Sequence, residues 1–181
     1  MTALQGLLAQ FRDMTLTERD KGTSFENLMV QYFKTEPFYK EQYADVLSYS
    51  DWVDQYGADL GITTKKDTGI DLGAVTTDGE FHAIQCKNYS PDHAISKKDI
   101  DSFFTASGKS YFSHRIIVAT TDKWTGNAQD SLENQTPPVS RIDLHNLENS
   151  VIDWTQYRED AKPVLKAQKQ LREHQTSALS S

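Results

Sequence analysis

The chain has 181 residues, of which 37% are hydrophobic and 10% aromatic, and its formal net charge is -7. This length and composition fit one globular domain with a buried core, and the single cysteine, Cys86, excludes an internal disulfide. No apolar run approaches the ~20 residues needed to cross a bilayer, and the N-terminus does not resemble a secretory signal. We therefore expect a cytoplasmic protein, and the acidic charge argues against a simple basic nucleic-acid binder.

Two helices are predicted at the start of the chain. Apolar residues recur at helical spacing over 4–11, and a second apolar helical face runs over 25–33, up to Pro37. Thr23 and Glu26 match the pattern of a capping box, which predicts that the second helix begins there. The first helix is then an extension, and the second is expected to pack on a sheet.

Alternating strand and helix signals follow. "HRIIVATT" is a continuous β-branched run typical of a strand buried on both faces, and the helix before it indicates a crossover to a parallel strand. The expected order is about α-β-β-β-α-β, an α/β fold with a central mixed sheet flanked by helices. The further elements are a strand at 46–47, a helical turn from Ser50 to Gly57, a hairpin over 69–89, helices over 96–109 and 127–134, a turn, short strand and turn over 137–147, and a packed segment over 151–157.

The hairpin "GIDLGAVTTDGEFHAIQCKNY" carries three polar residues in an apolar setting. A three-residue loop, Thr77 to Gly79, places Gly79 in the left-handed position that glycine favours. This register predicts a core-facing set comprising Ile70, Leu72, Ala74, Ile84 and Cys86, and an opposite face on which Asp71, Gln85 and Lys87 converge where Gly73 and Ala83 leave room.

The converging trio indicates a site for metal-assisted phosphodiester hydrolysis. A carboxylate and an amide oxygen directed at one point suit a hard cation such as Mg2+. A lysine alongside could orient the attacking water and offset the charge that develops at phosphorus. The alternative is that Asp71, Gln85 and Lys87 are ordinary polar residues on the wet face of a surface hairpin.

Four sequence blocks together carry a family resemblance. "GTSFENL", "GIDLGAV", "HAIQCKNY" and "IIVATTDKWTGNA" resemble, in order and spacing, the Mrr-like branch of the PD-(D/E)XK nucleases over residues 22 to 157. The resemblance implies a restriction-endonuclease-like core and Mg2+-dependent cleavage of double-stranded DNA. It implies Asp71, Gln85, Lys87 and Glu26 as catalytic residues, with Asp71, Gln85 and the backbone carbonyl of Cys86 as metal ligands. For Glu26 the capping box and the active site remain alternatives.

The tail extends the resemblance to a larger enzyme. "LREHQTSAL" resembles the opening block of superfamily 2 helicases, although the chain has no phosphate-binding loop. A nuclease ahead of such a motor is similar to the type ISP restriction-modification enzymes, which are single polypeptides with helicase-like, methyltransferase and target-recognition domains. We therefore expect a nuclease domain over 1–158, with an N-terminal helical extension over 1–21, and a linker and the start of a motor over 159–181.

Other functions and sites are also compatible with the sequence. The alternatives to an ATP-dependent restriction nuclease are a non-catalytic docking module for DNA or a neighbouring helicase, and a junction-resolving nuclease. The histidines lack paired ligand spacing, which argues against zinc, and Cys86 has no partner that would activate a thiol. Candidate contacts to the DNA backbone are Lys65, Lys66, Lys97, Lys98 and Lys123.

Overall fold

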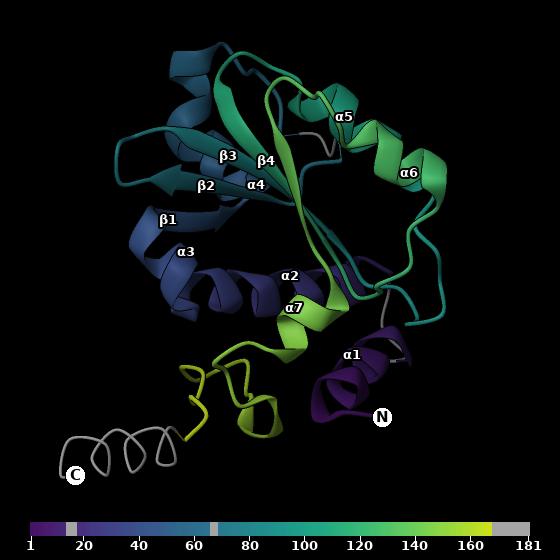
Figure 1. The fold of residues 1–181 in the computed structure, drawn as a ribbon. Helices are drawn as coiled ribbons and strands as arrows, with labels where there is room; N and C mark the ends of the chain where they lie inside the picture. The colour runs from purple at the N-terminus through teal and green to yellow at the C-terminus, as the bar shows by residue number, and fades with distance from the viewer. Residues whose placement is uncertain (14–17, 66–68, 168–181) are drawn as a thin grey trace, which may run out of the picture.

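The computed structural model describes residues 1–13, 18–65 and 69–167, with the backbone alone for 18–22. Five strands form one sheet in the order β1-β2-β3-β4-β5, with helices on both faces (Figure 1). β2 is antiparallel to both β1 and β3, whereas β3, β4 and β5 run parallel. This mixed sheet confirms the α/β fold expected from the sequence.

The elements follow one another in an order that matches the α-β-β-β-α-β expectation. The helices and strands are α1 (Ala3–Asp13), α2 (Glu18–Thr35), α3 (Pro37–Gln42), β1 (Tyr43–Ser48), α4 (Tyr49–Trp52), the π segment η1 (Val53–Gly57), the 3-10 turn η2 (Ala58–Leu60), β2 (Leu72–Thr76), β3 (Phe81–Lys87), α5 (Lys97–Ser107), β4 (Phe112–Ala119), α6 (Gly126–Ser131), β5 (Val139–Ile142), α7 (Leu144–Glu148) and the 3-10 turn η3 (Trp154–Gln156).

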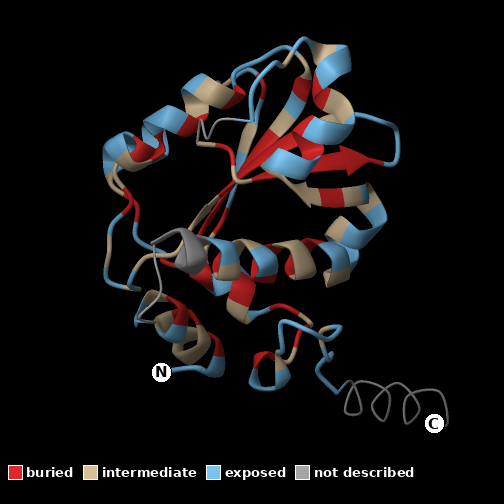
Figure 2. Cartoon of the chain, turned by 180° about the vertical axis from the view of Figure 1, so that it is seen from behind, coloured by how far each residue is buried: buried red, intermediate tan, exposed pale blue. Residues whose placement is uncertain are grey.

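Two apolar clusters fill the space on either side of the sheet. The sheet is the most deeply buried layer, and the outer faces of the helices are exposed (Figure 2). β4 is buried from Arg115 to Ala119, as its β-branched run predicts. One cluster includes Leu8, Phe11, Leu28, Phe33, Leu72, Ile84 and Leu147, and the other includes Trp52, Ala83, Ile100, Phe103 and Ile117.

The hairpin register agrees with the prediction. Leu72 pairs with Ile84 and Val75 with Phe81, and the loop is closed by the amide of Gly79 donating to the carbonyl of Thr76 at 2.9 Å. Gly79 has a φ of 85°, the left-handed conformation that glycine adopts without strain. The turn therefore has three loop residues, which fixes which side chains of β2 and β3 share a face.

The start of the second helix differs from the prediction. α2 begins at Glu18, so Thr23 and Glu26 lie inside the helix and do not form a capping box at its N-terminus. The prediction is wrong because Thr and Glu three residues apart also share one face in the interior of a helix, so the pattern does not identify a helix start.

Four other local features differ from the prediction. The turn after β1 is capped by Ser48, whose Oγ accepts from the amide of Asp51 at 3.2 Å, rather than near Ser50. The helical path continues beyond Gly57 through η2 and ends at Gly61, with a φ of 77°. α6 ends at Ser131, short of residue 134, and the predicted turn after β5 is the short helix α7.

After η3, residues 164–166 form backbone hydrogen bonds with residues 151–153. The amide of Asp153 donates to the carbonyl of Val164, and that of Lys166 to the carbonyl of Val151, both at 2.7 Å. The helicase-like block at 171–179 lies outside the described residues, and the linker and motor interpretation of 159–181 stays a prediction. Within the described parts of the chain, no helix is long and apolar enough to cross a membrane.

Candidate active site

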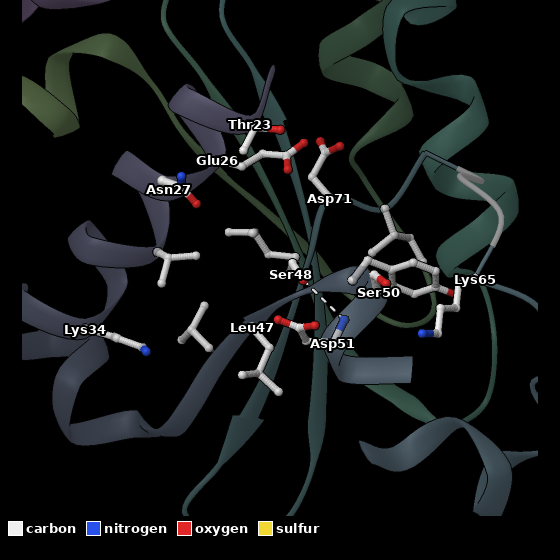
Figure 3. Close-up of a pocket in the computed structure, with 15 residues that line it drawn as sticks. Thr23, Glu26, Asn27, Lys34, Leu47, Ser48, Ser50, Asp51, Lys65 and Asp71 are labelled. Carbon is white, nitrogen blue, oxygen red and sulfur yellow. Dashed lines mark hydrogen bonds between the residues drawn. The ribbon is translucent and has the colours of Figure 1, made fainter. Parts of the chain in front are cut away.

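A cleft of about 800 Å³ opens between α2, the junction of β1 with α4, and the entry to β2 (Figure 3). α2 contributes polar side chains at helical spacing. The apolar residues that line the cleft include Val30 from α2 and Val46 and Leu47 from β1. The polar and charged lining residues are Thr23, Glu26, Asn27, Lys34, Ser48, Tyr49, Ser50, Asp51, Lys65 and Asp71.

Two carboxylates meet at one end of this cleft. The side chains of Glu26 and Asp71 come from α2 and from the residue before β2, and they point toward one another (Figure 3). The Oδ2 atom of Asp71 accepts a hydrogen bond of 2.7 Å from the backbone amide of Cys86. Two negative charges facing one another repel unless a cation or a proton lies between them, so the pair favours a cation site.

The backbone of Asp71 is held from two sides, by β3 and by the first residue of α4. Its amide donates to the carbonyl of Ile84 at 3.0 Å, and its carbonyl accepts from the amide of Tyr49 at 3.0 Å. The regular pairing of β2 with β3 begins only at Leu72, so Asp71 is not paired with Gln85 in the ladder. Its amide and its carbonyl therefore bond to segments on opposite sides. Because of this, Asp71 does not follow the regular alternation of side chains between the two faces of the sheet.

The predicted faces of the hairpin therefore need correction. Ile70 lies in the cluster with Ala83 and Ile117, not with Leu72 on the α2 side. A Cβ atom on Gly73 would lie 2.4 Å from Cγ of Trp52, so the space that small residues were expected to leave is filled by the indole. The prediction of an open face shared by the polar trio is wrong, since alternation fails at Asp71 and α4 covers the sheet.

Gln85 lies beneath the surface, next to the turn that leads into Asp71. The residue is 2% exposed, and its Nε2 donates to the carbonyl of Gly69 at 3.3 Å. Its Oε1 is buried and has no hydrogen-bond partner among the described residues. An unsatisfied buried acceptor is costly, by about 1–3 kcal/mol, and a cation is one partner that would satisfy it.

Lys87 is the last residue of β3, two positions beyond Gln85 and on the same side of the strand. Its carbonyl accepts from the backbone amide of Thr120 at 3.1 Å, which ties the end of β3 to the residue after β4. The side chain is half-buried. Because β2 and β3 are antiparallel, the C-terminal end of β3, with Lys87, lies at the same end of the sheet as Asp71 before β2.

Cys86 lies between Gln85 and Lys87 in the sequence, and its side chain is on the opposite face of β3. Burial raises the pKa of its thiol, and the carboxylates of Asp71 and Glu26 raise it further. The thiol therefore stays protonated, in agreement with the expectation that it is no nucleophile. The hydrogen bond from the amide of Cys86 places the carboxylate of Asp71 beside the Q-C-K segment.

The donor set fits a hard divalent cation with few protein ligands. No group of three or more histidine, cysteine, aspartate or glutamate residues suited to a metal occurs in the described parts of the chain. The donors at the end of the cleft are the carboxylates of Glu26 and Asp71 and backbone carbonyls, all of which are oxygen, whereas Gln85 and Lys87 are not among the described residues that line the cleft. Mg2+ accepts such a set because it usually keeps several waters.

The predicted DNA-contacting lysines are dispersed. Lys65 lines the cleft and forms an ion pair with Asp54, whereas Lys98 is exposed on α5. Lys66 lies outside the described residues. The other two are in ion pairs, Lys97 with Asp101 at 3.2 Å and Lys123 with Asp92 at 3.5 Å.

Sequence reasoning missed most of the cleft. Lys34 and Asn27 line it from α2, and their spacing of seven residues, about two helical turns, could have indicated a shared face. Ser48 and Ser50 line it from the end of β1 and from α4. No comparable signal identifies these two serines, because their proximity to α2 arises from the sheet and not from local spacing.

Comparisons with known proteins identify a matching family and a similar solved structure. A family of Mrr-type catalytic domains, described as restriction endonuclease, matches residues 34–164. A solved structure, the ATP-dependent type ISP restriction-modification enzyme LlaBIII bound to DNA, is 31% identical, with a TM-score of 0.68 over 94% of this chain. The match spans only 10% of that enzyme's chain. No curated protein matches significantly.

Proposed function

The chain belongs to the Mrr-type restriction endonuclease family, and from this premise we propose that it acts as a Mg2+-dependent DNA endonuclease domain. The observation that carries the proposal is the meeting of Glu26 and Asp71 at the end of the cleft (Figure 3), with the carboxylate of Asp71 hydrogen-bonded to the amide of Cys86 in the Q-C-K segment of β3. The unpaired buried Oε1 of Gln85 supports it, since a catalytic metal would supply the missing partner.

Each residue has a distinct role in this proposal. Asp71 and Gln85, with the carbonyl of Cys86, would hold the metal, and Glu26 would assist. When bound, Mg2+ would lower the pKa of a water and screen the charge of the phosphate.

Lys87 would orient the attacking water and stabilise negative charge as the phosphodiester oxygens gain it. The hydrogen bond from the amide of Cys86 holds the Asp71 carboxylate in one orientation before substrate arrives. Such preorganisation lowers the reorganisation needed during reaction.

The acidic charge of the chain fits a nuclease that is presented with DNA by other parts of a larger enzyme. We extend the proposal to a nuclease domain of an ATP-dependent, type ISP-like restriction-modification enzyme, on the basis of the 31% identity to LlaBIII. Its partners would be double-stranded DNA and, in the same polypeptide, helicase-like, methyltransferase and target-recognition domains. Residues 1–158 would form the nuclease and 159–181 the linker and the start of the motor.

The decisive experiment is DNA cleavage by the full-length protein with Asp71→Ala or Lys87→Ala. Both changes should abolish cleavage of duplex DNA in Mg2+, while any ATP hydrolysis continues unchanged. Intact cleavage in either variant would overturn the catalytic assignment and favour the docking-module alternative. Mg2+ titration of the purified variants separates the two changes, because only Asp71→Ala should weaken metal binding.

A further inference from the structure

Helix α1 contacts the segment that directly follows Lys87. The Nη1 atom of Arg12, in the last turn of α1, donates to the Oδ1 atom of Asn88 at 2.9 Å and to the carbonyl of Tyr89 at 3.1 Å. In return, the Nδ2 atom of Asn88 donates to the carbonyl of Leu8 at 3.4 Å. The end of α1 and the exit of β3 are therefore joined by three hydrogen bonds over a sequence distance of more than 70 residues.

The opposite side of the same segment is fixed by Thr120. Its amide donates to the carbonyl of Lys87 at 3.1 Å, and its Oγ1 accepts from the amide of Tyr89 at 2.7 Å. Residues 87–89 thus lie between the residue after β4 and the end of α1. Of these two supports, Thr120 belongs to the segment matched by the nuclease family, whereas Arg12 lies outside it.

The rest of α1 is attached to the domain independently of Arg12. Leu4, Leu8 and Phe11 are buried in the cluster on the α2 side of the sheet. At the N-terminal end of the helix, the Nε2 atom of Gln5 donates to Oε1 of Glu148 at 3.0 Å. Arg12 is consequently not needed to attach α1, and its guanidinium is partly desolvated, which makes its hydrogen bonds worth more.

We propose that Arg12 is a positioning residue, which holds Asn88 and Tyr89 so that Lys87 keeps its place at the end of β3. This inference rests on the proposed role of Lys87 in DNA cleavage. A displacement of about 1 Å at a catalytic group can cost about 100-fold in rate, so an anchor one residue from Lys87 has a direct route to affect the chemical step.

The test compares Arg12→Met with Arg12→Lys and with Gln5→Ala in the full-length protein. Methionine keeps much of the apolar stem and removes both donors, whereas lysine restores one. We expect Arg12→Met to lower the single-turnover rate at saturating DNA by about 10- to 100-fold, with little change in the DNA concentration for half-maximal rate. Arg12→Lys should recover part of the rate. Gln5→Ala, which removes an anchor at the other end of α1, should leave it unchanged.

A second readout does not depend on catalysis. Hydrogen exchange at the amides of Asn88 and Tyr89 should accelerate in Arg12→Met and stay slow in Gln5→Ala. A double change, Arg12→Met with Asn88→Ala, should be no slower in cleavage than Asn88→Ala alone if the two residues act through one link.

The outcomes separate the two proposals. Unchanged rate and exchange in Arg12→Met, with cleavage abolished in Asp71→Ala, would overturn the positioning role and leave the proposed function intact. A weaker apparent affinity for DNA with an unchanged saturating rate would also overturn it, since that is the signature of a phosphate contact. If Asp71→Ala still cleaves, the proposed function fails, and the exchange at Asn88 and Tyr89 alone then decides whether Arg12 holds the strand end.

Discussion

The backbone amide of Cys86 donates a 2.7 Å hydrogen bond to Oδ2 of Asp71, so the second strand of the hairpin orients the carboxylate at the entry to the first. This bond can be kept while the charge is removed, because an asparagine at position 71 still offers an acceptor oxygen. Asp71→Asn therefore separates the structural contribution of the residue from its electrostatic one.

We expect Asp71→Asn to change the free energy of unfolding by less than about 1 kcal/mol, while DNA cleavage falls by about 100-fold or more. Mg2+ affinity, measured by calorimetric titration, should fall with the rate. Asp130→Asn, on the exposed surface of α6, is the matched control and should leave both unchanged. Wild-type Mg2+ affinity in Asp71→Asn would remove Asp71 from the metal site.

The capping-box role predicted as an alternative for Glu26 is excluded, because α2 begins eight residues earlier, at Glu18. Glu26→Gln should therefore cost less than about 0.5 kcal/mol in unfolding free energy, whereas loss of a capping residue costs typically about 1 kcal/mol. Cleavage should fall by about tenfold or more, because one carboxylate next to Asp71 is neutralised. Chemical denaturation and a cleavage assay distinguish the two roles, with exposed Glu41→Gln on α3 as the control.

Trp52 packs directly against the backbone of the sheet at Gly73. A Cβ atom there would lie 2.4 Å from Cγ of the indole, so Gly73→Ala should destabilise the protein by about 2–4 kcal/mol. Gly79→Ala provides the comparison, because no atom lies within 4 Å and the cost, about 1 kcal/mol, comes only from a φ of 85°. Equal unfolding midpoints for the two variants in urea would contradict this packing.

The hairpin shows both the reach and the limit of sequence reasoning. Its loop and register follow from Gly79 and from alternation, which are local properties, and they are confirmed by the pairing of Leu72 with Ile84. Asp71 lies just outside that register, where its backbone bonds reach Tyr49 as well as β3. A contact that depends on a third segment cannot be inferred from the spacing of two strands.

The same distinction explains the errors at Glu26 and Gly73. The T-x-x-E pattern is compatible with a helix start and with a helix interior, and only the observed start at Glu18 decides between them. A glycine in a strand indicates close approach of another group, but the sequence does not identify that group as Trp52, which arrives from α4. The residue types of the candidate site could thus be predicted, whereas their arrangement depends on tertiary packing.

His82 should make stability depend on pH. The ring is buried, its Nδ1 lies 2.7 Å from the hydroxyl of Tyr43, and the ring of His114 is its other titratable neighbour. Burial, with a smaller contribution from His114, lowers the pKa of His82 from 6.5 to about 4. The unfolded chain therefore binds a proton at a higher pH than the folded protein does, and stability falls as pH decreases from about 6.5 to about 4.

The expected loss over this range is on the order of 3 kcal/mol. His82→Gln offers an amide that can still bond to Tyr43 but does not titrate, so the unfolding free energy of this variant should vary less between pH 6.5 and pH 4. His145→Gln, at an exposed position on α7, is the control. Parallel pH profiles for wild type and His82→Gln, measured by urea denaturation, would show that His82 is not the responsible group.

Gln85 offers the sharpest test of the metal site, because its Oε1 is buried and has no hydrogen-bond partner in the described parts of the chain. Gln85→Glu adds a buried negative charge next to the turn that leads into Asp71 and removes the donor to the carbonyl of Gly69. Without metal, the variant should lose about 2–4 kcal/mol of stability, since a buried charge without a counterion is unfavourable. Mg2+ should restore much of that loss by supplying the counterion.

Gln85→Met is the matched comparison, because it has a similar length and no oxygen. It should be as stable as wild type without metal, or more stable, and Mg2+ should stabilise it less than wild type. Thermal denaturation of all three proteins with and without Mg2+ measures these differences independently of DNA cleavage. If Mg2+ raises the unfolding temperature of wild type, Gln85→Glu and Gln85→Met by equal amounts, the Oε1 atom does not bind the metal, and the cation would have to be held by the carboxylates of Asp71 and Glu26 with backbone oxygens.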